Sequence, residues 1–195
     1  MTSFYDLFIE YRNDFSDLDA VLGGADIIDM SADPAERKLY LKVRFPRLVS
    51  EKTLDKINAI IKERLGLGAV KTMPVFSSSL FSEKYSGEIS EWAKRNVPMA
   101  NGFFADCKYN FSDGKTEIEL MHGGKQILED VGAQNLISKM LRERFGVTQD
   151  ISFTQSDGYD AGEDISAVQK KIDSMAPKAS SVKSGSSRSF DPVKE

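Results

Sequence analysis

The fold is decided by residues 104–154, which read FADCKYNFSDGKTEIELMHGGKQILEDVGAQNLISKMLRERFGVTQDISFT. Two runs of alternating apolar and polar residues, 105–111 and 115–121, flank Ser112-Asp113-Gly114. Asp-Gly supplies the positive φ that a tight hairpin turn needs, so the two runs are predicted to pair as antiparallel strands. A third alternating run, 147–154, ends the stretch and predicts one more strand.

The segment between the hairpin and the last strand is predicted to be helical with one interruption. Gly132 breaks the pattern, and Gly146 follows the last apolar position, where glycine often ends a helix. Apolar residues recur there at intervals of three and four, which places them on one helical face: Ile127, Leu128, Val131, Leu136, Ile137, Met140, Leu141 and Phe145.

The upstream residues predict the same sequence of elements. An apolar stripe runs through residues 3–22 and favours an amphipathic helix or a broken pair of helices. Strands are expected at 25–30, 38–45 and 69–76, and Pro74 places the third at an edge or a bulge. Ser50 is expected to cap a helix over 51–65, and a further helix is expected from residue 82 to about Arg95.

The predicted fold class is α+β, in two small subdomains that each have a three-stranded sheet with helices on one face. The first spans residues 1–78 and the second 82–155. Their central helices end alike, in IKERLG at 61–66 and LRERFG at 141–146, which suggests an internal repeat. Residues 156–195 are expected to hold a short helix at 163–175 and then a disordered linker.

Composition narrows the function classes. The 195 residues carry 26 basic and 30 acidic side chains, a net charge of -4, so nucleic acid or membrane binding would have to be local. No apolar run is long enough to span a bilayer, and no signal peptide is recognisable, so we expect a cytoplasmic protein. Cys107 and His122, the one cysteine and the one histidine, do not make a usual zinc site. No cofactor and no small-molecule substrate are expected.

The sequence resembles the N-terminal region of PolC, the replicative DNA polymerase III alpha subunit of Gram-positive-type bacteria. The residues that carry this resemblance are Glu83-Lys84-Tyr85-Ser86 leading to Trp92, the hairpin with Gly114-Lys115-Thr116-Glu117-Ile118, and Arg144-Phe145-Gly146 before a strand. A fainter likeness covers residues 37–43, followed by Pro46 and a helix. The resemblance extends over about residues 10–155.

This resemblance implies a non-catalytic interaction module, although the full-length polymerase is an enzyme with a 3'-5' exonuclease. In the family, the first subdomain resembles the polymerase-binding domain of the clamp-loader tau subunit, which makes tau the expected partner. The second resembles a type II KH fold, ordered helix, strand, strand, helix, helix, strand. DNA is a further possible contact within the full polymerase. The tail would then lead toward an OB-fold.

Nucleic-acid binding through the KH-like half is the alternative. KH domains that bind nucleic acid use a Gly-x-x-Gly loop whose backbone approaches the phosphates. The matching loop here is Gly132-Ala133-Gln134-Asn135, which lacks the second glycine and any cation, and Glu129 and Asp130 stand beside it. The departure favours a loop that merely joins two helices.

Four further groups of residues have both a functional and a structural interpretation. The best basic cluster is formed by Lys139, Arg142 and Arg144. It could contact DNA or a partner, or it could simply be a solvated helix end. The aromatic stripe Phe4, Phe8 and Tyr11 is a candidate partner surface if the sheet leaves it uncovered, and otherwise core. Cys107 with His122 could act as nucleophile and base, but a half-buried cysteine is the simpler interpretation. His122-Gly123-Gly124-Lys125 lacks Walker spacing and favours a connector.

Overall fold

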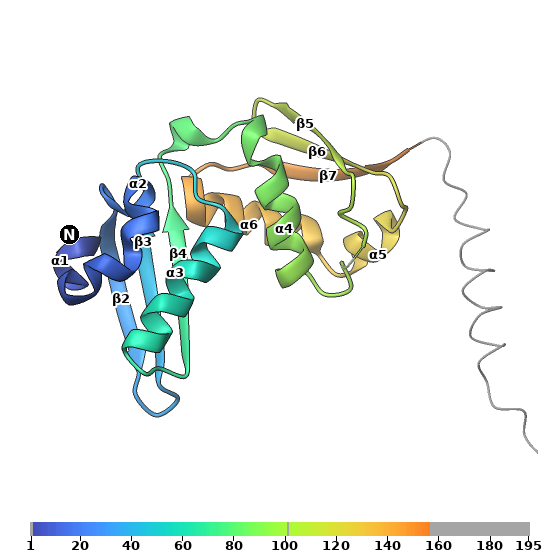
Figure 1. Ribbon diagram of the computed structural model, residues 1–195. Coiled ribbons are helices and arrows are strands. Elements are labelled where there is room, and N and C mark those ends of the chain that lie inside the picture. The colour runs from blue at the N-terminus through green and yellow to red at the C-terminus, as the bar shows by residue number, and fades with distance from the viewer. Residues whose placement is uncertain (1, 101, 157–195) are drawn as a thin grey trace, which may run out of the picture. The chain divides into compact units, whose positions relative to one another are not determined.

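Two separate β-sheets organise the chain, one of four strands and one of three (Figure 1). The structure is a computed structural model of all 195 residues, and it describes residues 2–100 and 102–156. Helices and strands alternate along the chain, and the helices pack against the sheets, which confirms the predicted α+β class. The predicted helix at 163–175 and the predicted disordered tail lie outside the described residues.

The first sheet has the order β1-β2-β3-β4. β2 (Asp26–Asp33) is antiparallel to β3 (Lys38–Arg44), and β4 (Ala69–Val75) is parallel to β3. The prediction of three strands was wrong, because β1 (Thr2–Ser3) also pairs with β2. Two residues are too few to show a period of two, so the sequence pattern could not reveal this strand.

The segment before β2 is helical but mostly not α-helical. It runs through α1 (Phe4–Leu7), the 3-10 helix η1 (Ile9–Leu18) and α2 (Asp19–Leu22). The apolar stripe seen in the sequence is nevertheless buried, since Phe4, Phe15 and Leu22 are fully covered. The spacing of apolar residues at intervals of three and four therefore identified the buried face. It does not distinguish one α-helix from a series of short α- and 3-10 helices.

β3 shows how the first sheet is covered on one side. Leu39, Leu41 and Val43 are buried, whereas Tyr40 and Arg44 between and beyond them are exposed. The buried side is covered by α3 (Glu51–Arg64), whose Ile57 and Ile61 are almost completely enclosed. Ser50 caps α3 as predicted, with its Oγ accepting the Thr53 backbone N–H.

The outer edge of β4 is closed to further strands. The backbone N–H of Thr72 donates to Asn58 Oδ1 at 2.9 Å, and that of Phe76 donates to the Arg144 carbonyl at 2.6 Å. Pro74, between them, has no N–H to offer. Its predicted edge position is confirmed, and the three residues together prevent strand addition on this side.

The second sheet has the order β5-β6-β7. Its elements follow the helix, strand, strand, helix, helix, strand order expected from the sequence. β5 and β6 are antiparallel, β6 and β7 are parallel, and the helices lie against the buried side where Ile118, Ile151 and Phe153 point. The elements are η2 (Ser78–Leu80), η3 (Glu83–Tyr85), α4 (Ser86–Asn96), β5 (Lys108–Ser112), β6 (Lys115–Leu120), α5 (Lys125–Asp130), α6 (Ala133–Phe145) and β7 (Asp150–Gln155).

Glycines with positive φ end the elements where the sequence predicted breaks. Gly114 turns the hairpin at φ 68°, Gly132 separates α5 from α6 at φ 68°, and Gly146 ends α6 at φ 68°. Glycine adopts this region without the steric penalty of a Cβ. The first strand of the hairpin starts later than predicted, at Lys108, because Asp106 itself has a positive φ of 55° and cannot continue a strand.

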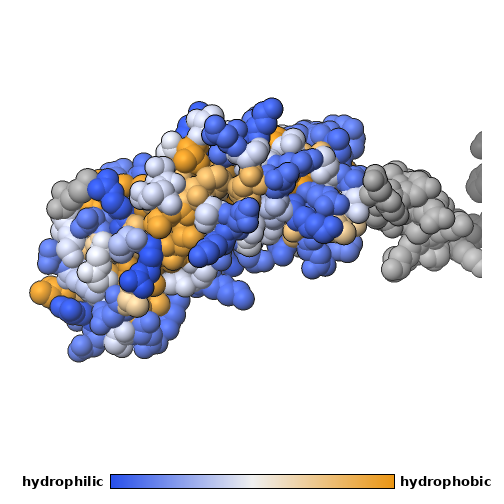
Figure 2. Space-filling model, turned by 90° about the horizontal axis from the view of Figure 1, so that it is seen from above, coloured by the Kyte–Doolittle hydropathy of each residue, from blue (hydrophilic) through white to orange (hydrophobic). Residues whose placement is uncertain are grey.

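The two sheets share one hydrophobic core, so residues 1–78 and 82–155 are not independent compact units. A single unit spans Met1–Tyr159, and one cluster of buried side chains runs through both halves. Aromatic rings join them: Phe76 lies 6.3 Å from Phe45 of the first half and 5.0 Å from Phe145 of the second, between ring centroids. Figure 2 shows apolar residues gathered near the middle of one face, bordered by hydrophilic ones.

Candidate functional site

The region where the two halves meet, here called the joint, contains a buried ion pair between α6 and α3. Arg144, near the end of α6, donates through Nη1 to Glu51 at the start of α3 and to the Tyr85 hydroxyl at 2.7 Å. The Arg144 and Glu51 side chains are 10% and 11% exposed. Burial raises the pKa of Tyr85. Burial alone would lower the pKa of Arg144, but Tyr85 and Glu51 outweigh it and raise that pKa. Arg144 therefore stays charged in the folded chain.

Two more polar contacts tie α3 to α4. The Glu51 backbone N–H donates to Glu88 Oε2 at 2.7 Å, so a carboxylate from α4 satisfies the positive end of α3. Farther along, Arg95 Nη1 lies 2.7 Å from Asp55 Oδ2. These contacts join elements from different halves and hold α3 beside α4.

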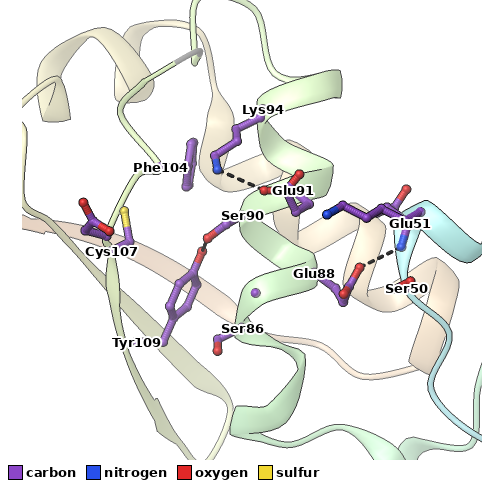
Figure 3. A pocket seen from close by; sticks show the side chains of 13 residues that line it. Ser50, Glu51, Ser86, Glu88, Ser90, Glu91, Lys94, Phe104, Cys107 and Tyr109 are labelled. Carbon is purple, nitrogen blue, oxygen red and sulfur yellow. Dashed lines mark hydrogen bonds and ion pairs between the residues drawn. The ribbon is translucent and has the colours of Figure 1, made fainter.

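A polar pocket of about 440 Å³ opens beside this joint (Figure 3). It lies between the start of α3, one side of α4 and the segment 104–109. Its polar groups largely satisfy one another: Ser90 Oγ bonds the Tyr109 hydroxyl at 2.7 Å, and Lys94 Nζ lies 3.0 Å from Glu91 Oε1. Glu88 already occupies the anion position at the helix start, so the pocket is not arranged to receive a phosphate there.

Cys107 lines this pocket but is not set up as a nucleophile. Its Sγ donates to the Phe103 carbonyl at 3.3 Å, and burial raises the pKa of the thiol to about 11. Little thiolate therefore forms near neutral pH. His122 is exposed and faces Asp106 instead, with Nε2 3.4 Å from Oδ2. Cys107 is partly buried, as its alternating position predicted.

The structure separates the predicted basic cluster. Lys139 and Arg142 are exposed on α6, and Lys139 Nζ lies 3.9 Å from Glu143 Oε1. Arg144 is buried in the ion pair with Glu51, so its prediction as a surface contact for DNA or a partner was wrong. The reason is its position facing α3, which the sequence of α6 alone does not reveal.

Of the predicted loop Gly132-Ala133-Gln134-Asn135, only Gly132 lies between the two helices, and residues 133–135 form the start of α6. Gly132 provides the left-handed backbone, and its N–H bonds the Glu129 carbonyl at 3.0 Å. Ala133 is fully buried and already belongs to α6. A side chain at Gly124, in the preceding connector, would meet the Phe103 ring at 2.4 Å, so close packing explains that glycine.

The predicted aromatic partner surface is mostly core. Phe4 is fully buried and Phe8 is 3% exposed, with their ring centroids 4.8 Å apart, while Tyr11 is partly buried. Phe4 and Phe8 were therefore wrong as surface residues: the helical turns fold over the sheet and cover them. Sequence reasoning also missed Glu51 and Glu88, since single acidic residues on exposed-looking helix turns carry no signal of a distant partner.

The described residues, 2–100 and 102–156, contain neither a metal-binding group of side chains nor a helix that could span a membrane. No three or more His, Cys, Asp or Glu side chains there are grouped to hold a metal ion. No helix in these residues has the length and apolarity to cross a bilayer.

The comparisons with known proteins identify no family. No family model matches the chain, and no curated protein matches it. Among solved structures, "Crystal structure of APE1850" is similar at 13% identity, over 75% of this chain and 96% of that one. The TM-score of 0.29 is too low to support an argument about this chain.

Proposed function

We propose that this chain is a non-catalytic interaction module at the N-terminus of a PolC-type replicative DNA polymerase, acting in the cytoplasm. Its partner would be another replisome protein, and the clamp-loader tau subunit is the one that the resemblance implies. The chain's own part is to present a rigid surface on two joined sheets. Polymerisation and proofreading would belong to other domains of such a polymerase.

The observation that carries the proposal is where the resembling residues lie. Tyr85 from the first resembling segment and Arg144 and Phe145 from the last meet in the joint, although about sixty residues separate them. The Tyr85 and Phe145 ring centroids are 4.7 Å apart in an edge-to-face contact. Three of the residues that carry the likeness to PolC thus help to hold the two halves together, and the element order of the second half agrees with the order that the resemblance implies.

The test is direct binding of the whole chain to purified tau from the same genome, by titration calorimetry. The whole chain is needed because its two halves share one core. A saturable one-to-one complex in the micromolar range or tighter is expected. No heat and no complex at high micromolar concentration, with the chain shown to be folded by circular dichroism, would contradict the proposal.

The nucleic-acid alternative is not favoured by any specific observation in the described residues. Arg144 is buried, and the loop at 132–135 is flanked by Glu129 and Asp130. Nucleic-acid binding stays a prediction, and a gel shift can test it. Binding at low salt that becomes weaker when Arg142 is replaced would support it.

A further inference from the structure

A groove runs between the first sheet and the helices of the second half. Two adjoining hollows of about 110 and 200 Å³ share Trp92 and Asn96 of α4 and Met140 and Glu143 of α6. The first hollow continues onto β3 and β4. Both are smaller than the pockets that usually hold small molecules, so they suit side chains of a docked segment.

The apolar part of the lining is here called the floor of the groove. It is formed by residues from both halves: Met73 and Val75 on β4, Trp92 on α4, and Leu136 and Met140 on α6. All but Met140 keep part of their surface in contact with solvent. A methionine-rich floor adapts to different apolar side chains, and tryptophan is enriched where proteins bind one another.

The rim of the groove is positively charged. Lys42 on β3 and Lys71 on β4 lie on the same face, diagonal to each other in the parallel register. Neither has a carboxylate within 4 Å among residues 2–100 and 102–156. Asp29, the cross-strand neighbour of Lys42, does not line the groove, and its Oδ1 accepts the Met30 N–H at 2.9 Å.

The other charges in the groove balance one another. Lys139 lies beside Glu143, and Arg144 is neutralised by Glu51. Among the residues that line the groove, the two unpaired lysines therefore set the sign of the charge. A partner that lays apolar side chains on the floor and carboxylates against Lys42 and Lys71 would complement both properties.

The backbone next to the groove limits how a partner can bind. Asn58, Pro74 and the Arg144 carbonyl close the outer edge of β4, so strand addition is excluded there. Binding must use side chains, as when an amphipathic helix lays its apolar face into a groove. Single-stranded DNA fits less well, because most of the floor is aliphatic and offers only Trp92 for stacking bases.

We propose that this groove binds an acidic amphipathic segment of a partner protein, with apolar side chains on Trp92, Met73 and Leu136 and carboxylates at Lys42 and Lys71. The inference rests on the proposed role in protein contacts and gives that role a surface. It does not depend on tau being the partner.

Trp92, the single tryptophan of the chain, reports directly on the groove. The probe is a synthetic peptide of about 14 residues with leucine at helical spacing and glutamate elsewhere. A second peptide carries lysine in place of every glutamate. In a titration at about 50 mM salt, we expect the acidic peptide to shift the emission of Trp92 to shorter wavelength with saturation, and the lysine peptide to leave it unchanged.

Variants in which the charge of the two lysines is reversed test their role in binding. The double variant K42E/K71E should bind the acidic peptide at least about tenfold more weakly and should gain binding of the lysine peptide. The matched control is Lys115→Glu, an exposed lysine at the hairpin of the other sheet, which should bind as the wild type does. Circular dichroism checks that each variant is folded.

Three results would overturn the inference. They are no emission change with the acidic peptide at millimolar concentration, equal binding by wild type and K42E/K71E, or displacement of the peptide by a thymidine oligonucleotide of about 15 nucleotides. The two proposals fail separately. If tau binds wild type and K42E/K71E equally and the peptide does not bind, the groove fails alone; if the peptide binds and tau does not, the replisome assignment fails alone.

Discussion

The two halves of the molecule use the same strand pairing but finish their central helices differently. In each, an antiparallel pair is followed by a helical crossover to a parallel strand: β2, β3 and β4 through α3, and β5, β6 and β7 through α5 and α6. Both helices end in Arg, an apolar residue and Gly, at 64–66 and 144–146. Gly66 and Gly146 have φ of 60° and 68°.

The matching residues at the two helix ends have opposite surroundings. The Arg64 side chain is 48% exposed and pairs with Asp14, whereas that of Arg144 is 10% exposed and pairs with Glu51. Leu65 is 41% exposed and Phe145 only 3%. The comparison teaches that local sequence sets where the helix ends, while the partner element decides whether the end is surface or core.

The largest effect is expected from removing the buried arginine. Arg144→Met should lower the free energy of unfolding by about 4 kcal/mol, because Glu51 would stay buried without its partner. Arg64→Met should change it by less than about 1 kcal/mol, since exposed pairs contribute little. Urea denaturation of both variants measures the difference.

A second variant separates the charge from the packing. E51Q/R144M removes both charges and should recover much of the stability lost in Arg144→Met, because no buried charge is left unpaired. Equal losses for Arg64→Met and Arg144→Met would show that the two helix ends are equivalent after all.

The next largest loss of stability is expected from truncating Phe145, at the end of α6. Phe145 packs on Phe76 and Tyr85 with centroid distances of 5.0 and 4.7 Å, so Phe145→Ala leaves a cavity and should cost about 3 kcal/mol. Leu65→Ala, at the equivalent exposed position, should cost less than about 1 kcal/mol. Thermal denaturation followed by circular dichroism compares them, and a similar fall in Tm for both would break the proposed contrast.

Much of this fold could be read from the sequence, because short-range patterns determine it. Alternation at 38–45 located β3, Asp113-Gly114 located the hairpin turn, and Ser50 with Gly66 located the two ends of α3. The two-residue strand β1 and the 3-10 character of Ile9–Leu18 were missed, since neither leaves a distinctive period.

The joint could not be predicted, because its partners are distant in sequence. Glu51 and Arg144 are 93 residues apart, and each alone looks like an ordinary charged residue at a helix end. The groove at Lys42 and Lys71 has the same origin, since its lining comes from two strands of the first half and two helices of the second. Single-sequence patterns report what one element does and not what it packs against.

A smaller and equal effect is expected at the two terminal glycines. Gly66→Ala and Gly146→Ala each place a Cβ on a residue with positive φ, which should cost about 1 kcal/mol. Nothing lies within 4 Å of a Cβ at Gly146, and only the end of the Arg37 side chain, 3.5 Å away, approaches one at Gly66. Urea denaturation should give matching losses. A much larger loss at Gly146 would mean that the joint also depends on its backbone.

The last comparison concerns two buried tyrosines, and its effect appears only at alkaline pH. Burial, with the bond to Asp19, raises the pKa of Tyr5 from 10.0 to about 12, and burial also raises that of Tyr85, although Arg144 opposes this. The unfolded chain loses these protons first, so the contribution of each tyrosine is complete below pH 10 and falls as pH rises toward the folded pKa. Tyr5→Phe and Tyr85→Phe should therefore each flatten the loss of stability as pH rises above 10. Urea midpoints between pH 10 and 12 measure both slopes, and an unchanged slope in either variant would contradict the pKa shift given to that tyrosine.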